Sequence, residues 1–259
     1  MICDAHCHPF NLLQKNGSFE EEACRADLHC VSSATSLEEF EYNEALSGKR
    51  VSLGRLPFVS GYGVHPQFPR WSAASMQPYL DTLHALAGEG RLGAAGECGF
   101  DLFDEAYRET EKIQDDLFIP HLELAVEKGL PLVLHVRRAM HKIFFHSKAL
   151  KRCSSVIFHS WPGTQGEGEA LLRRGVNAFF SFGNTVTLNH REQIRCCAAF
   201  PVEHILTETD APYQAPRGKQ YSSWNDLTVI LKAMADLRKT GVEELEANIY
   251  CNFRKAFGV

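Results

Sequence analysis

The sequence predicts one α/β domain over residues 1–259, folded as a (β/α)8 barrel of the TIM type. Eight short apolar runs alternate with amphipathic segments, a pattern typical of parallel strands joined by helices. Eight parallel strands are the number that closes such a barrel, and 259 residues suit a single barrel. Histidines and carboxylates also recur at the ends of the apolar runs, where barrels of this class form their active sites.

The predicted strands are the eight apolar runs, each bounded by turn residues or by the start of a helical pattern. They occupy residues 2–8, 27–33, 57–65, 92–99, 131–136, 155–160, 177–182 and 205–210. An open, doubly wound parallel sheet is the competing architecture, because periodicity alone does not establish closure. No glycine-rich phosphate loop opens a helix, however, and this favours the barrel.

The segments between the strands carry helical signals. Ser36 and Glu39 have the spacing of a capping box, which predicts that a helix begins there. A later segment keeps helical spacing until a glycine and a proline end it, through Ile113, Leu117, His121, Leu124, Gly129 and Pro131. Pro162 and Gly163 introduce another helix, and helical patterns over 226–239 and 243–257 close the sequence.

Composition excludes some classes of protein. A net charge of −5 argues against coating nucleic acid through overall basicity, while leaving room for local phosphate contacts. No signal peptide or membrane-spanning apolar run is evident, and the nine cysteines are scattered and odd in number. We therefore expect a cytoplasmic protein with reduced thiols, no membrane association and no obligate protein partner.

The residues with metal-binding chemistry gather at the predicted strand ends. Because strand side chains alternate between faces, His6 and His8 point to one side, while Cys7 points toward the outer helices. Asp4 shares the face of the two histidines, deeper in the barrel, where we expect it to orient a ligand imidazole. The complete set of candidate ligands is His6, His8, Glu97, His135, His159 and Asp210.

Four imidazoles and two carboxylates suit a pair of divalent ions, with zinc, manganese, magnesium and iron as candidates. Glu97 lies among small residues and is a candidate to bridge the two ions. Asp210 is a candidate to orient the attacking water or to accept its proton. Glu208 has the same strand parity as Asp210, and is either a second catalytic acid or an ion-pair partner inside the barrel.

Basic side chains near the predicted metal edge indicate where an anionic substrate would bind. No acidic residue occurs between Glu127 and Glu167, and Arg137 and Arg138 in this stretch are the best candidates to hold a phosphate. Arg217 and Lys219, on the loop after Asp210, form a second candidate pair. Three aromatic residues after strand ends are either base-stacking platforms or packed loop residues, namely Phe68, Trp71 and Trp161.

Several motifs in order along the chain resemble the TatD family of metal-dependent hydrolases, within the amidohydrolase-type barrels. The early motifs are Asp4-Ala-His6-Cys7-His8, Gly63-Val-His65-Pro66 and Gly96-Glu97-Cys98-Gly99-Phe-Asp101, with Gln114 and Phe118 on the helix that follows. The later ones are His135-Val-Arg137-Arg138-Ala139, Phe158-His159-Ser160, Thr207-Glu-Thr-Asp210-Ala-Pro-Tyr213, Arg217-Gly-Lys219 and Asn252-Phe-Arg-Lys-Ala-Phe257.

This resemblance implies a closed barrel with a two-metal centre that hydrolyses phosphodiester bonds. It further implies a 3′-5′ exodeoxyribonuclease, with the ends of single-stranded DNA as its substrate. The six candidate ligands match the ligands of the family, and His65 matches a histidine that faces the substrate phosphate. The catalytic candidates are thus Asp210, Glu208 and His65.

The sequence also departs from the family pattern around the substrate. Arg138 replaces an acidic residue, and Gln67 replaces the second histidine of a His-Pro-His motif. After Lys219, the segment Gln220-Tyr-Ser-Ser replaces the usual Asn-Glu-Pro. Hydrolase chemistry therefore rests on firmer ground than nuclease specificity.

Two alternatives remain open. The first is a metal-dependent hydrolase of a small amide, lactone or phosphate ester, and the second is a metal-stabilised barrel that binds without turnover. A serine hydrolase is poorly supported, because no Gly-x-Ser-x-Gly motif is present. A cysteine nucleophile is disfavoured as well, because strand parity turns Cys7 and Cys98 away from the metal edge.

Overall fold

The computed structural model describes residues 1–67 and 73–259, and that part of the chain forms one eight-stranded parallel sheet. Its strand order is β1-β2-β3-β4-β5-β6-β7-β8, so each strand pairs with its neighbours in sequence. The strands are β1 (Ile2–Cys7), β2 (Leu28–Ala34), β3 (Val59–Tyr62), β4 (Ala94–Asp101), β5 (Leu132–Arg137), β6 (Val156–Phe158), β7 (Ala178–Phe182) and β8 (Ile205–Thr207). All eight predicted strands are present in the predicted order.

The two ends of the sheet meet just beyond β8. Asp210 N donates a hydrogen bond to His6 O at 2.9 Å, and His8 N donates one to Ala211 O at 2.8 Å. These bonds connect the chain after β8 to the end of β1. The barrel prediction is confirmed, and the open doubly wound sheet is excluded.

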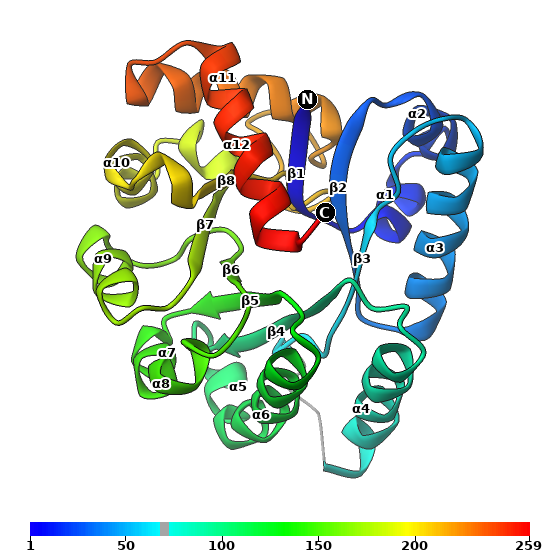
Figure 1. The fold of residues 1–259 in the computed structure, drawn as a ribbon, viewed down its shortest axis with the longest axis vertical. Helices are drawn as coiled ribbons and strands as arrows, with labels where there is room; N and C mark the ends of the chain where they lie inside the picture. The colour runs from blue at the N-terminus through cyan, green and yellow to red at the C-terminus, as the bar shows by residue number, and fades with distance from the viewer. Residues whose placement is uncertain (68–72) are drawn as a thin grey trace.

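Helices surround the barrel, as Figure 1 shows. In the described part of the chain they are α1 (Pro9–Lys15), α2 (Phe19–Arg25), α3 (Leu37–Ser52), α4 (Ala73–Gly88), α5 (Glu105–Arg108), α6 (Glu111–Lys128), α7 (Met140–Phe145), α8 (Ser147–Leu150), α9 (Gln165–Arg173), α10 (Arg191–Ala199), α11 (Leu227–Arg238) and α12 (Val242–Phe257). No helix in residues 1–67 and 73–259 is long and apolar enough to cross a membrane. The cytoplasmic location expected from the sequence stays a prediction.

Helix ends follow the sequence signals in part. Ser36 Oγ accepts from Glu39 N at 3.2 Å at the start of α3, but the Glu39 carboxylate accepts from Thr35 N instead of Ser36 N. Only half of the predicted capping box therefore forms. A complete box begins α9, where Thr164 and Glu167 cap each other, and Gly129 ends α6 with a left-handed φ of 67°.

Apolar side chains between the strands and the helices form the core. Trp161 is fully buried there, and its ring lies 4.6 Å from Phe180 and 5.3 Å from Phe158 between ring centres. The suggestion that Trp161 stacks on a base is therefore wrong, because no face of its ring is accessible. Phe68 and Trp71, the other two aromatic candidates, lie outside the described residues.

Candidate metal centre

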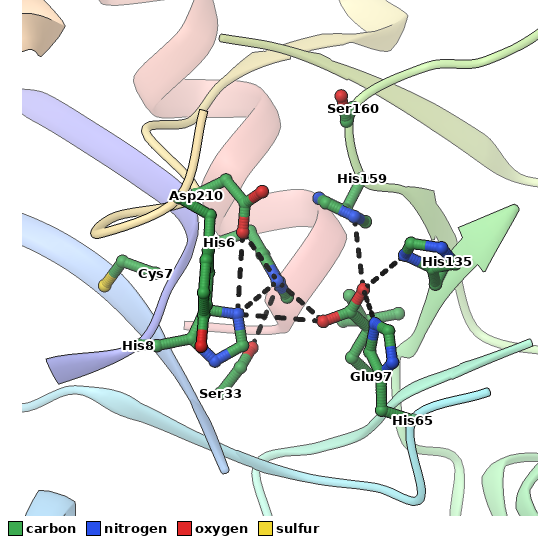
Figure 2. A network of polar contacts seen from close by, with 12 residues as sticks. His6, Cys7, His8, Ser33, His65, Glu97, His135, His159, Ser160 and Asp210 are labelled. Atoms are coloured by element: carbon green, nitrogen blue, oxygen red, sulfur yellow. Dashed lines mark hydrogen bonds and ion pairs between the residues drawn. The ribbon is translucent and has the colours of Figure 1, made fainter. Parts of the chain in front are cut away.

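The end of β1 supplies the first two candidate ligands. His6 Nε2 and His8 Nε2 lie 3.1 Å apart, and both side chains are buried. The other ring nitrogen of His6, Nδ1, lies 3.0 Å from Ser33 Oγ on β2. Cys7 points away from the histidines in Figure 2 and belongs to a buried cluster with Leu12 of α1. The predicted alternation of faces is thus confirmed.

Asp4 does not orient an imidazole, contrary to the expectation from its parity. Its carboxylate accepts from His6 N at 3.2 Å, from Thr209 N at 2.9 Å and from Thr209 Oγ1 at 2.6 Å. Burial raises the pKa of Asp4 to about 7, although the Thr209 hydrogen bonds oppose this shift. Asp4 joins the backbone of β1 to the segment after β8, and so fixes the positions of His6 and Asp210 indirectly.

Glu97 stands at the centre because β4 and β5 approach each other closely. Gly96 and Gly99, on either side of Glu97 and Cys98, have φ values of +126° and +134°. Residues with a side chain rarely adopt such values. A Cβ atom at Gly96 would clash with Val133 O, and one at Gly99 would clash with His135 O. The small residues noted in the sequence therefore allow β4 to bring the Glu97 carboxylate beside the end of β5.

The two oxygens of Glu97 face different groups of histidines, as Figure 2 shows. Oε2 lies 3.0 Å from His6 Nε2 and 3.7 Å from His8 Nε2. Oε1 lies 2.9 Å from His135 Nδ1, 3.1 Å from His159 Nε2 and 3.2 Å from His65 Nε2. One buried carboxylate thus stands between two sets of nitrogen donors.

Asp210 completes the group on the Oε2 side. Its Oδ1 lies 3.5 Å from His8 Nε2 and 3.7 Å from His6 Nε2, while Oδ2 accepts from Gln214 Nε2 at 2.8 Å. Asp210 lies three residues after the end of β8 and adopts a left-handed φ of 53°, and its carboxylate faces the histidines at the end of β1. The structure therefore brings all six predicted ligands together.

Two further acids support the histidines on the Oε1 side. Glu208 Oε1 lies 3.4 Å from His159 Nδ1 and accepts from Ser160 N at 2.7 Å. Glu208 is fully buried behind His159, and faces the ring nitrogen opposite to the one that meets Glu97. The sequence left two interpretations of Glu208 open, a second catalytic acid or an ion-pair partner inside the barrel. This position fits the ion-pair partner.

Asp101 is the second supporting acid, and sequence reasoning assigned it no role. Its Oδ2 lies 3.0 Å from His135 Nε2 and 3.5 Å from Arg137 Nη1, and accepts from Gln67 Nε2 at 2.7 Å. Burial opposes ionisation, but the hydrogen bonds from His135 and Gln67 outweigh it and lower the pKa of Asp101 to about 2. Its strand parity, shared with Glu97, was the signal available in the sequence.

Carboxylates and imidazoles shift one another's pKa values in the centre. Burial lowers the pKa values of His6 and His65, which favours neutral rings. Burial also opposes protonation of His8, His135 and His159, but the neighbouring carboxylates outweigh it and raise the pKa values of these three rings. The carboxylates of Glu97 and Asp210 have lowered pKa values, because the histidines outweigh the effect of burial. Because neutral imidazoles and ionised carboxylates are the forms that bind divalent ions, a cation would displace the protons that His8, His135 and His159 hold without it.

The distances between the donor atoms also indicate a metal site. Three overlapping groups offer ligand atoms within 4.8 Å of one another, namely His6 with His8 and Glu97, His6 with His159 and Asp210, and His65 with Glu97 and His135. A set of nitrogen and carboxylate oxygen donors suits zinc, manganese or iron. The residues therefore fit a metal centre, and His65 lies closer to it than the sequence indicated.

A cavity of about 840 Å³ opens over the centre. His65, Arg137 and Arg138 line it, as expected of residues that contact substrate. Arg217 and Lys219 are exposed and are not among its lining residues. Lys219 Nζ instead lies 2.5 Å from Asp226 Oδ1. The structure thus brings one of the two predicted basic pairs to the site.

In sequence, the chain is similar to a family of DNases and to proteins named as metal-dependent hydrolases or exonucleases. The family model described as TatD related DNase matches residues 3–258. The uncharacterized metal-dependent hydrolase YcfH of Escherichia coli K12 is 29% identical over 271 residues, which cover 100% of this chain and 96% of that protein. The 3′-5′ ssDNA/RNA exonuclease TatD of Klebsiella pneumoniae is 32% identical over 207 residues, or 76% of each chain.

Solved structures agree on the fold. YJJV, a TatD homologue from Escherichia coli K12, has a TM-score of 0.81 and 24% identity, and the match covers 100% of this chain and 98% of that chain. An uncharacterized amidohydrolase from Saccharomyces cerevisiae has a TM-score of 0.77 and 15% identity, with 99% of each chain covered. At these identities the likeness concerns the barrel itself.

Proposed function

The chain belongs to the family of TatD-related DNases, metal-dependent hydrolases of ester bonds, and we propose that it is a two-metal phosphodiesterase. Its proposed substrate is the 3′ end of single-stranded nucleic acid, DNA in the first place. The observation that carries the proposal is the position of Glu97, whose two carboxylate oxygens each face a separate set of histidines. A carboxylate placed in this way suits the bridge between two cations.

Each oxygen of Glu97 has two candidate ligand imidazoles near it, and Asp210 adds a carboxylate on the Oε2 side. His6, His8 and Asp210 would hold one ion with Oε2, and His135 and His159 would hold the other with Oε1. Two divalent ions supply Lewis-acid stabilisation of charge on phosphoryl oxygens and make water more acidic. The protein residues around them position the substrate and move the proton.

Asp210 is the proposed acceptor of the proton from the attacking water. Its lowered pKa keeps the carboxylate ionised, and Gln214 Nε2 fixes its orientation through Oδ2, so that Oδ1 faces the centre. General-base catalysis of this kind contributes about 10²- to 10⁴-fold to a rate. His65 lines the cavity with Nε2 beside the centre, where it can donate to a phosphate oxygen.

Glu208 and Asp101 act through the ligands. Glu208 Oε1 faces His159 Nδ1, and Asp101 Oδ2 faces His135 Nε2. Each acid fixes the orientation of an imidazole whose opposite nitrogen lies beside Glu97 Oε1. We therefore assign Glu208 a positioning role, behind the catalytic groups.

Two features support a nucleic-acid substrate. A relative 32% identical to this chain is named for exonuclease activity on single-stranded DNA and RNA. The cavity over the centre is also lined by Arg137 and Arg138, which offer guanidinium groups for a phosphate. Such local basic groups suffice in a protein of net charge −5, because an exonuclease grips only a few phosphates at a time.

The test uses protein reconstituted with zinc or manganese and single-stranded oligonucleotides labelled at either end. We expect stepwise shortening from the 3′ end, which a chelator stops and which falls at least 100-fold in Glu97→Gln and Asp210→Asn. Asp236→Asn on α11 is the matched control, because Asp236 is exposed and pairs with Lys232. Undiminished, chelator-resistant cleavage in both site variants would contradict the proposal. Faster turnover of a lactone or monoester than of a diester would favour the small-substrate alternative.

A further inference from the structure

Two guanidinium groups and one aromatic ring form a cluster on one side of the cavity. The guanidinium carbons of Arg137 and Arg138 lie 4.1 Å and 4.4 Å from the ring centre of Phe103. All three residues line the cavity, and Phe103 is 39% exposed. We call Phe103, Arg137 and Arg138 the arginine cluster.

The two positive charges of the arginine cluster have only one carboxylate, that of Asp101, as a neighbour within ion-pair distance in the described residues. Arg137 Nη1 lies 3.5 Å from Asp101 Oδ2, but this oxygen also meets His135 Nε2 and Gln67 Nε2. For Arg138, no carboxylate lies within ion-pair distance in the part of the chain that the structure describes. The cluster therefore faces the cavity with positive charge that Asp101 neutralises only in part.

The backbone at Arg138 is consistent with a specific placement of this side chain. Arg138 has a left-handed φ of 53°, a conformation costing about 1–2 kcal/mol in residues other than glycine, asparagine and aspartate. It follows the last residue of β5 and places the guanidinium group over Phe103. The ring holds both arginines by cation–π attraction before a ligand arrives, which lowers the entropy lost on binding.

The arginine cluster is connected to the metal centre through Asp101 and through β5. Asp101 Oδ2 faces both His135 Nε2 and Arg137 Nη1. Arg137 follows His135 by two residues on β5, about 7 Å along the strand. A phosphate held by the cluster would thus be a close neighbour of a phosphate at the metal centre, yet distinct from it.

From this arrangement we propose that the arginine cluster binds a second phosphate group, one nucleoside away from the phosphate at the metal centre. The ligand class is a nucleotide unit with two phosphates, as in an oligonucleotide that carries a phosphate on the 5′ side of the scissile one. This inference rests on the proposed function, because it takes the metal centre as the place of the first phosphate. Single-phosphate esters would then be poorer ligands than chains with successive phosphates.

The test compares the binding of thymidine 3′,5′-bisphosphate with that of each thymidine monophosphate, by calorimetry on metal-reconstituted protein. The wild-type protein should bind the bisphosphate at least tenfold more tightly, as expected for charge-assisted hydrogen bonds. Arg138→Asn should abolish most of this preference, and asparagine tolerates the left-handed backbone, so the fold is retained. Phe103→Leu should reduce the preference about two- to fivefold.

Arg173→Asn is the matched control, because Arg173 is an exposed arginine at the end of α9, paired with Glu169 and absent from the cavity lining. It should keep the full preference for the bisphosphate. Equal binding of all three ligands by the wild-type protein, or an unchanged preference in Arg138→Asn, would overturn the inference.

Failure of the proposed function has a different signature. Wild-type turnover of bis(p-nitrophenyl) phosphate, a diester with one phosphate, depends on the metal centre and needs no second phosphate site. No turnover of this diester, together with a bisphosphate preference that Arg138→Asn removes, would contradict the phosphodiesterase and support the arginine cluster. Turnover of the diester without any preference for the bisphosphate would support the phosphodiesterase and contradict phosphate binding by the arginine cluster.

Discussion

Replacing Ser33 by alanine should weaken metal binding without touching a metal ligand. Ser33 Oγ lies 3.0 Å from His6 Nδ1, and both side chains are buried, with 2% and 0% exposure. When Oγ accepts the proton of Nδ1, the electron pair of His6 Nε2 is left to face Glu97 Oε2 at 3.0 Å. In Ser33→Ala the ring loses the contact that fixes both its tautomer and its orientation.

The expected size follows from related metal sites. Loss of a hydrogen-bond partner behind a ligand histidine lowers metal affinity about 10- to 100-fold, or about 1.4–2.7 kcal/mol. The lost hydrogen bond should also lower the free energy of unfolding of the metal-free protein by about 1 kcal/mol. Metal affinity should therefore change by more than the stability of the apoprotein does.

The matched control is Ser32→Ala, which removes the same atoms from the neighbouring position of β2. Ser32 Oγ donates to Val59 O at 3.5 Å and makes no contact with His6. Competition between each protein and a chromogenic chelator measures zinc affinity, and chemical denaturation measures stability. Wild-type affinity in Ser33→Ala, or an equal loss in Ser32→Ala, would refute the role of Ser33.

Two further predictions concern buried groups outside the metal centre. Burial lowers the pKa of His121 to about 4, so its stabilising effect is present above pH 6.5 and is lost as pH falls toward 4. Between pH 7 and pH 4 the wild type should lose about 3 kcal/mol more unfolding free energy than His121→Gln does. Parallel pH profiles would contradict this. The guanidinium of buried Arg50 donates to four backbone oxygens, those of Ala23, Ala26, Leu28 and Leu56. Arg50→Met should lower the free energy of unfolding by about 3 kcal/mol or more, as measured by urea denaturation, and by more than the control Arg55→Met does. A smaller loss than in that control would be inconsistent with stabilisation by the four hydrogen bonds of Arg50.

Local rules explain what the sequence predicted correctly. Alternation along a strand needs no knowledge of the partner strands, so it placed His6 and His8 on the inner face and Cys7 among the helices. The glycines around Glu97 were equally informative, because close approach of two backbones demands the absence of a Cβ atom. Alternation of apolar runs with helical patterns was enough for the barrel.

Contacts between distant segments account for what was missed. Ser33 lies on β2, and only the register of β1 against β2 brings its hydroxyl to His6. Asp4 has the expected parity, but its partners depend on how the segment after β8 meets β1. The direction of a loop side chain also cannot be read from the sequence. The packing of Trp161 in the core and the contact of Lys219 with Asp226 were therefore not predicted.

The central proposal is that Glu97 would bridge two metal ions, and metal stoichiometry tests it most directly. Elemental analysis of protein dialysed against zinc or manganese should find two ions per chain in the wild type and in the surface control Asp236→Asn. Glu97→Gln should retain at most one tightly bound ion, because an amide offers one neutral oxygen where the carboxylate offers two charged ones. Two tightly bound ions in Glu97→Gln, or one ion in a fully active wild type, would contradict the account.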